Sequence, residues 1–191
     1  MSTFRSIRRS AACVAVLALV AAACGNDDST FSDDTSGSGE SASDFQVVTT
    51  VAPITSIAAN VIGDCATITG IVPEGTNSHT FEPPPSAAEI MTIADVVLIN
   101  GLQLEEPTKE LARANVADGV QIIELGDLTI EPDQYKYDFS FPQDGGKPNP
   151  HLWTDPTYAI KYADVILATM SQRDPDNADY YRSNHAAFVA K

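Results

Sequence analysis

Short apolar runs alternate with helical periods along residues 46–191. Four runs indicate strands: QVVTTVA from residue 46, CATITGIVP from 65, DVVLIN from 95 and VQIIEL from 120. Helical spacing separates them, as in the apolar series Ile54, Ile57, Ala58, Val61 and Ile62, and a further helix is predicted over residues 105–115. Continuous Val/Ile/Leu runs separated by helices predict an α/β fold, with a parallel sheet covered by helices on both faces.

Start signals predict where three other helices begin. Ser86-Ala87-Ala88-Glu89 has the spacing of a capping box, in which serine and glutamate satisfy the first free amides reciprocally. Asp155-Pro156 and Asp174-Pro175 each combine a capping aspartate with a proline in the first turn. We therefore expect Asp155 to act as a helix cap.

Two segments depart from this alternation. Residues 129–148 have no regular period and are rich in Pro, Gly and aromatic residues, so they are expected to form a long loop. The last predicted helix reaches Lys191 without a stop signal. From this pattern we expect the chain to be cut inside a helix.

The N-terminus has the layout of a secretory signal peptide, predicted over residues 1–23. Three arginines precede an apolar run over residues 11–23, which is shorter than the roughly 20 residues of a membrane-spanning helix. The small residues at 21–23 lie directly before Cys24 and resemble a bacterial lipobox. We therefore predict lipidation of Cys24, the alternative being ordinary cleavage that leaves a spare cysteine.

Residues 24–45 are rich in Gly, Ser and Asp and almost free of apolar side chains, which predicts a disordered acidic tether. Without the three arginines of the signal, the chain carries 8 basic and 26 acidic residues, a net charge of −18. This balance argues against nucleic acid as a partner. Cys65 is the one cysteine of the predicted folded part, and its apolar surroundings favour a buried structural thiol over a functional one.

Two of the three histidines lie in predicted loops of similar build. His79 in GTNSHTFEPPPS and His151 in KPNPHLWTDP each precede a predicted helix, which places both near the carboxyl edge of the sheet. Neutral imidazole is a common ligand of zinc and other first-row divalent ions. We therefore expect the two side chains to lie close together and bind one ion, although a single loop histidine is more often an ordinary surface residue.

Residues beside these histidines have two interpretations each. Glu82 is either a second-shell partner or occasional carboxylate ligand, or a surface residue ahead of the three prolines. Trp153, the single tryptophan, either walls the metal cleft from water or packs beneath its loop.

Four segments in order carry a resemblance to a known family. They are VVTTVAPITSIAANVIGD, GTNSHTFEPPPSAAEIMTIADVVLINGLQLE, NPHLWTDP and RDPDNADYYRSN. Through them residues 47–191 resemble the zinc/manganese solute-binding proteins of ABC transporters (ZnuA/TroA-like). The resemblance implies two lobes, each a parallel sheet with helices, joined by one long helix with the metal between the lobes. Residues 46–174 then correspond to the first lobe, and residues 175–191 to the start of the connecting helix.

By position, the resemblance makes His79 and His151 the first two metal ligands. The third and fourth ligands of the family lie in the second lobe, which these 191 residues do not include. His185 falls on the connecting helix and is expected to be structural or solvent-facing. The long loop lacks the His-rich segment of many zinc-selective members, which leaves zinc and manganese both open.

The function expected from these features is that of a receptor rather than an enzyme. Anchored by lipid at the outer face of the cytoplasmic membrane or in the periplasm, it would capture zinc or manganese as the transported ligand and pass it to an ABC permease. One alternative is a zinc-dependent hydrolase, which would need a general base, although the chain has no HExxH motif. The other alternative is an adhesion-type lipoprotein on the same scaffold.

Overall fold

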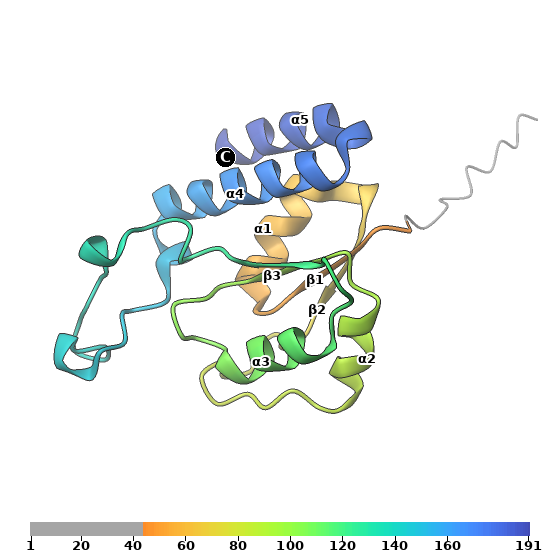
Figure 1. Cartoon of the computed structure of the whole chain (residues 1–191). Coiled ribbons are helices and arrows are strands. Elements are labelled where there is room, and N and C mark those ends of the chain that lie inside the picture. The colour runs from red at the N-terminus through yellow and green to blue at the C-terminus, as the bar shows by residue number, and fades with distance from the viewer. Residues whose placement is uncertain (1–43) are drawn as a thin grey trace, which may run out of the picture. The chain divides into compact units, whose positions relative to one another are not determined.

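The computed structural model describes residues 44–191 (Figure 1). The predicted signal peptide, the lipid site at Cys24 and nearly all of the predicted tether lie outside the described residues. Among the helices of residues 44–191, none combines the length and apolar character needed to cross a membrane.

Four short strands form one parallel sheet, as predicted. They are β1 (Gln46–Thr49), β2 (Thr67–Gly70), β3 (Val96–Ile99) and β4 (Gln121–Glu124), in the order β2-β1-β3-β4. All four are shorter than the apolar runs that predicted them. The first run ends early because Pro53, at the start of the next helix, fixes a helical φ and lacks an amide hydrogen for the sheet.

Helices cover both faces of this sheet (Figure 1). One face is covered by α1 (Ala52–Ile62) and α4 (Pro156–Arg173), and α5 (Ala178–Val189) packs on these two helices. The other face is covered by α2 (Ser86–Thr92) and α3 (Glu106–Asn115). Successive strand residues alternate between the two cores: Val96 and Leu98 face the first, and Val97 and Ile99 face the second. Because each face is buried, every position of β3 is apolar, which is the pattern seen in the sequence.

The starts of α2 and α4 agree with the sequence in position, but only one of them agrees in mechanism. Asp155 caps α4 by accepting a hydrogen bond from the Thr157 amide at 2.9 Å, as predicted. The capping box at Ser86 is wrong, because this serine is already the first helical residue and makes no side-chain cap. The N-cap is Pro85, whose ring restricts φ to the helical value that is found there.

The start of the last helix also differs from the expectation. Asp174-Pro175 opens a 3-10 turn, η5 (Pro175–Asn177), and α5 begins only at Ala178. The Asp174 carboxylate does not cap a backbone amide, because it accepts hydrogen bonds from the side-chain Nδ2 of Asn177 and from the Tyr181 hydroxyl. Tyr181 is fully buried, and its hydroxyl needs an acceptor there.

The structure also places the third histidine, His185, and the cysteine of the folded part, Cys65. His185 on α5 pairs through Nε2 with Asp164 Oδ1 on α4 at 2.7 Å, which favours the structural alternative for this residue. Cys65 ends η1 (Gly63–Cys65) and is half-buried rather than buried, because it lies at the margin of the larger core. Burial, followed by the negative charges of Asp174 and Asp64, raises the pKa of its thiol. The division into a lobe over 46–174 and a connecting helix from 175 stays a prediction.

Candidate metal centre

The two loop histidines meet beyond the carboxyl edge of the sheet, which confirms their predicted proximity. His79 lies between β2 and α2, and His151 immediately precedes η4 (Leu152–Thr154) and α4. Their Nε2 atoms are 3.2 Å apart. Two nitrogens bound tetrahedrally to one zinc ion at about 2.0–2.1 Å each would be about 3.3 Å apart. The separation therefore fits two donors that share one ion.

Local hydrogen bonds explain how the His79 loop holds its shape. The side-chain oxygen of Asn77 accepts a hydrogen bond from the His79 amide at 3.0 Å, and the backbone oxygen of Asn77 accepts one from Thr80. Asparagine commonly forms such turns because its side chain can bind the backbone two residues later. The turn leaves His79 exposed to solvent, so an ion can reach its imidazole from outside.

The tautomer of His151 is set by Asn149. The Asn149 side-chain oxygen accepts hydrogen bonds from the His151 backbone amide at 2.9 Å and from His151 Nδ1 at 2.8 Å. A proton on Nδ1 leaves the Nε2 lone pair free to bind a metal. Burial, then the neighbouring His79, lowers the pKa of the half-buried His151, while Asp138 opposes the shift. This shift favours the neutral form of His151, which is the form that binds metal.

Asp138 fixes the orientation of Asn149 in turn. Its Oδ2 accepts a hydrogen bond from the Asn149 amide nitrogen at 2.5 Å, so the amide oxygen faces His151. Desolvation opposes ionisation of Asp138, but hydrogen bonds from Phe141, Asn149 and Ser140 outweigh it and lower its pKa. The negative charge of Asp138 is thus linked to the His151 imidazole through Asn149. Asp138 lies in the aperiodic loop, so no signal in the sequence singled it out.

Aromatic rings border the two imidazoles. Phe141 lies 5.7 Å from His79 and 5.5 Å from His151 between ring centroids, and sequence reasoning missed it. Trp153 lies 5.2 Å from His151, packs against the larger core, and lines a cavity of about 220 Å³ together with His151. The packing supports the second interpretation of Trp153, and its role as a wall of the metal cleft stays a prediction.

Other acids do not complete the site within the described residues. Glu82 is exposed, and no hydrogen bond joins it to either histidine in residues 44–191. In the same residues no group of three or more His, Cys, Asp or Glu side chains could hold a metal ion. The site thus offers two imidazole nitrogen donors on a face that is open to solvent on the His79 side.

Known proteins share this arrangement of elements. Residues 47–191 match the model of the ZnuA family, described as zinc-uptake complex component A, periplasmic. The manganese-binding lipoprotein MntA of Halalkalibacterium halodurans is 33% identical over 177 residues, covering 92% of this chain and 53% of MntA. The manganese ABC transporter substrate-binding lipoprotein PsaA of Streptococcus pneumoniae is 31% identical over 169 residues, covering 81% of this chain and 50% of PsaA.

Solved structures agree with these sequence matches. The Mn-bound periplasmic metal binding protein of Candidatus Liberibacter asiaticus superposes with a TM-score of 0.67 and 29% identity, covering 76% of this chain and 52% of that protein. The chain therefore spans about half the length of the relatives that it matches. With the family model covering residues 47–191, the chain belongs to the ZnuA family.

Proposed function

We propose that this chain is the metal-capturing part of an exported, lipid-anchored substrate-binding protein of a metal ABC transporter. It binds zinc or manganese as cargo at the outer face of the cytoplasmic membrane or in the periplasm and passes the ion to a permease. The observation that carries this proposal is the convergence of His79 Nε2 and His151 Nε2 to 3.2 Å. The names of the relatives, which are metal-binding lipoproteins, support the anchor and the cargo.

The chemistry of the donors favours transition metals. Neutral imidazole nitrogen suits zinc and its first-row neighbours, whereas calcium and magnesium prefer cages made of oxygen. The Asn149 hydrogen bond keeps His151 in the tautomer that binds metal. The family description names zinc and the relatives' names specify manganese, so both ions belong to the proposal.

Binding fits this geometry better than hydrolysis does. A zinc hydrolase needs a general base within hydrogen-bonding reach of the metal-bound water. Asp138 Oδ1 already accepts the Ser140 and Phe141 amides, and its Oδ2 accepts the Asn149 side chain. Glu82 is exposed on the loop. We therefore assign no bond-breaking step to this site.

The test is calorimetric titration of the purified chain with zinc and with manganese. His79→Ala and His151→Ala should each lower the zinc affinity at least tenfold. His185→Ala is the matched control, because His185 binds Asp164 away from the site and its loss should leave the affinity unchanged. One-to-one binding that survives the double variant His79→Ala/His151→Ala would place the ligands elsewhere and reject the proposal.

A second arm tests whether the site needs further ligands. Two donors supply only part of a four-ligand set, so the 191-residue chain should bind zinc weakly. Supplying the remaining half of a full-length relative such as MntA, as a fused segment, should raise the affinity by several orders of magnitude. If that fusion gives no gain, the receptor assignment is wrong.

A further inference from the structure

Asn100 lies directly after β3 and is fully buried. Its Nδ2 donates hydrogen bonds to the carbonyl oxygens of Pro150 and Gly101, both at 3.0 Å. Its Oδ1 accepts a hydrogen bond from the Tyr162 hydroxyl on α4 at 2.8 Å. One amide side chain therefore joins the end of β3, the helix α4 and the residue that precedes His151.

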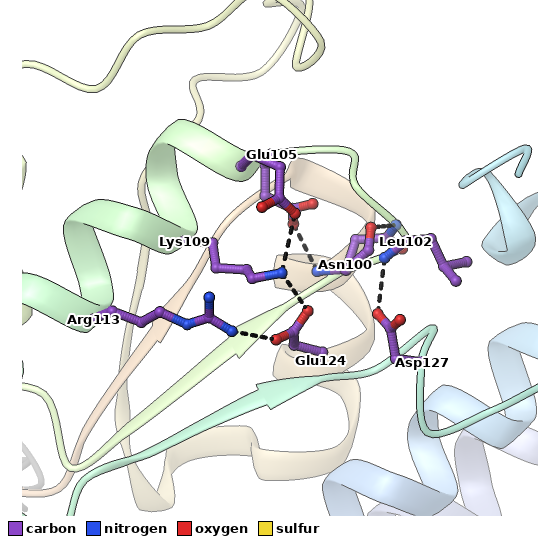
Figure 2. A network of polar contacts seen from close by, with 9 residues as sticks. Asn100, Leu102, Glu105, Lys109, Arg113, Glu124 and Asp127 are labelled. Atoms are coloured by element: carbon purple, nitrogen blue, oxygen red, sulfur yellow. Dashed lines mark hydrogen bonds and ion pairs between the residues drawn. The ribbon is translucent and has the colours of Figure 1, made fainter. Parts of the chain in front are cut away.

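A buried carboxyl group holds the backbone of Asn100. Glu105 is 3% exposed, and its Oε1 accepts hydrogen bonds from the Asn100 amide and the Thr50 hydroxyl, both at 2.7 Å. Figure 2 shows Glu105 and Asn100 side by side at the start of α3. Burial raises the pKa of Glu105, although its hydrogen bonds oppose the shift. The position of Asn100 is therefore fixed through its backbone as well as through its side chain.

The turn between Asn100 and Glu105 is held in an unusual conformation. Gly101, Leu102 and Gln103 have φ values of 78°, 52° and 61°, which residues with side chains rarely adopt. Asp127 Oδ2 accepts the Leu102 amide at 2.8 Å (Figure 2), and the Leu102 side chain is buried. Backbone strain of this kind persists where the surroundings over-determine the conformation, and it clusters at functional sites.

Ion pairs hold α3 against β4 beneath this turn. Lys109 Nζ lies 3.0 Å from Glu106 Oε1. Lys109 and Arg113 both pair with Glu124, at 2.9 and 3.1 Å (Figure 2). Lys109 is largely buried, so its ion pairs are less screened than exposed ones would be. These ion pairs therefore stabilise the packing of α3 on β4, next to the turn that begins at Asn100.

We propose that Asn100 is a positioning residue for His151, an inference that rests on the proposed role of His151 as a metal ligand. The Pro150–His151 peptide group is held at both of its polar atoms. Its carbonyl oxygen accepts Asn100 Nδ2, and its amide hydrogen binds Asn149 Oδ1 at 2.9 Å. These two bonds fix the plane from which the His151 side chain departs.

Such control matters because a metal ligand tolerates little displacement. Functional side chains must be held within about 0.5 Å and 10–20° of the productive geometry. Asn149 holds the imidazole from within its own loop, whereas Asn100 ties that loop to the sheet. Without the Asn100 side chain, the loop would keep its internal hydrogen bonds, but the position of His151 relative to His79 would no longer be fixed.

The test compares zinc affinity with the stability of the fold in three variants. Asn100→Asp replaces the donor to Pro150 with an acceptor and should lower zinc affinity about tenfold, the usual effect of one lost buried hydrogen bond. Tyr162→Phe removes the hydrogen bond to Asn100 Oδ1 but leaves Asn100 Nδ2 bound to Pro150, and it should lower zinc affinity about threefold. Asn184→Asp is the matched control, because Asn184 binds the Val61 carbonyl away from the site.

Zinc titrations are run on the full chain where urea curves show each variant to be folded. If the two site variants lose no more affinity than Asn184→Asp does, the positioning role is overturned. If Asn100→Asp does not fold, the same comparison is made with Tyr162→Phe.

A readout without metal separates this proposal from the proposed function. If the wild-type chain binds no zinc, the proposed function fails while positioning is still tested by imidazole ¹⁵N resonances. Asn100→Asp should shift or broaden the His151 signals and leave those of His185 unchanged. Unchanged His151 signals would overturn the positioning role.

Discussion

The orientation of the Asn149 amide can be tested by exchanging the residue types at positions 138 and 149. In the wild type, Asp138 Oδ2 accepts the Asn149 amide nitrogen at 2.5 Å, and Asn149 Oδ1 accepts His151 Nδ1 at 2.8 Å. Asn149→Asp places two carboxylates in contact, and their repulsion should move residue 149 away from His151 Nδ1. Asp138→Asn sets one amide group against another and favours a flip that turns Asn149 nitrogen toward His151. Each single change should therefore disturb the tautomer that binds metal.

The expected fall in affinity follows from the hydrogen bonds that each change breaks. Asn149 makes two hydrogen bonds to His151, and removal of an outer-shell partner costs about 10- to 100-fold in metal affinity. Since His79 also contributes to the site, we expect about 10- to 30-fold for each single variant, or about 1.4–2 kcal/mol. The double exchange Asp138→Asn/Asn149→Asp restores a donor facing an acceptor at both positions. It should recover most of the wild-type affinity.

The assay is zinc calorimetry on the wild type, the two single variants and the double variant, at one pH above 7. Urea unfolding of each protein controls for changes in stability. The reasoning is refuted if the single variants bind like the wild type, or if the double variant binds as weakly as the weaker single one. Either result would mean that this chain of hydrogen bonds does not determine the state of His151.

Three further predictions concern the pH response, the anchor and the core. Burial and His79 lower the pKa of folded His151, so at low pH the unfolded chain binds a proton that the folded chain does not. The free energy of unfolding should therefore fall as the pH drops below about 6.5. Urea titrations at pH 7.5 and 5.5 should show this fall, and His151→Gln should make the free energy of unfolding less dependent on pH. Cells given a fatty-acid analogue should label the wild type and not Cys24→Ala, and equal labelling would contradict lipidation. Ile54 is fully buried in the larger core, so Ile54→Ala should cost about 2–5 kcal/mol and Ile54→Val about 0.5–1.5 kcal/mol in urea unfolding; equal costs for the two would argue against close packing there.

The sequence by itself determined the order and type of the strands and helices. Apolar positions repeat with a period that follows from local backbone geometry, so β3 was visible in its unbroken apolar run, which both cores bury. The carboxyl ends of parallel strands meet at one edge, which is why the sequence alone could place His79 and His151 near each other. Asp155 acts within two residues of its partner, so its cap was also visible.

Only the tertiary structure decided how the two histidines are held. Asn100 binds Pro150 across 50 positions of the chain, and Phe141 reaches both imidazoles from a loop without a period. Even the local motif at Ser86 failed, because the preceding prolines start that helix without a side-chain cap. Periodicity reports which side of an element is buried, whereas the partner of a buried polar atom depends on where distant segments come to rest. Hydrogen bonding at the site is therefore a property of the packed chain rather than of any segment within it.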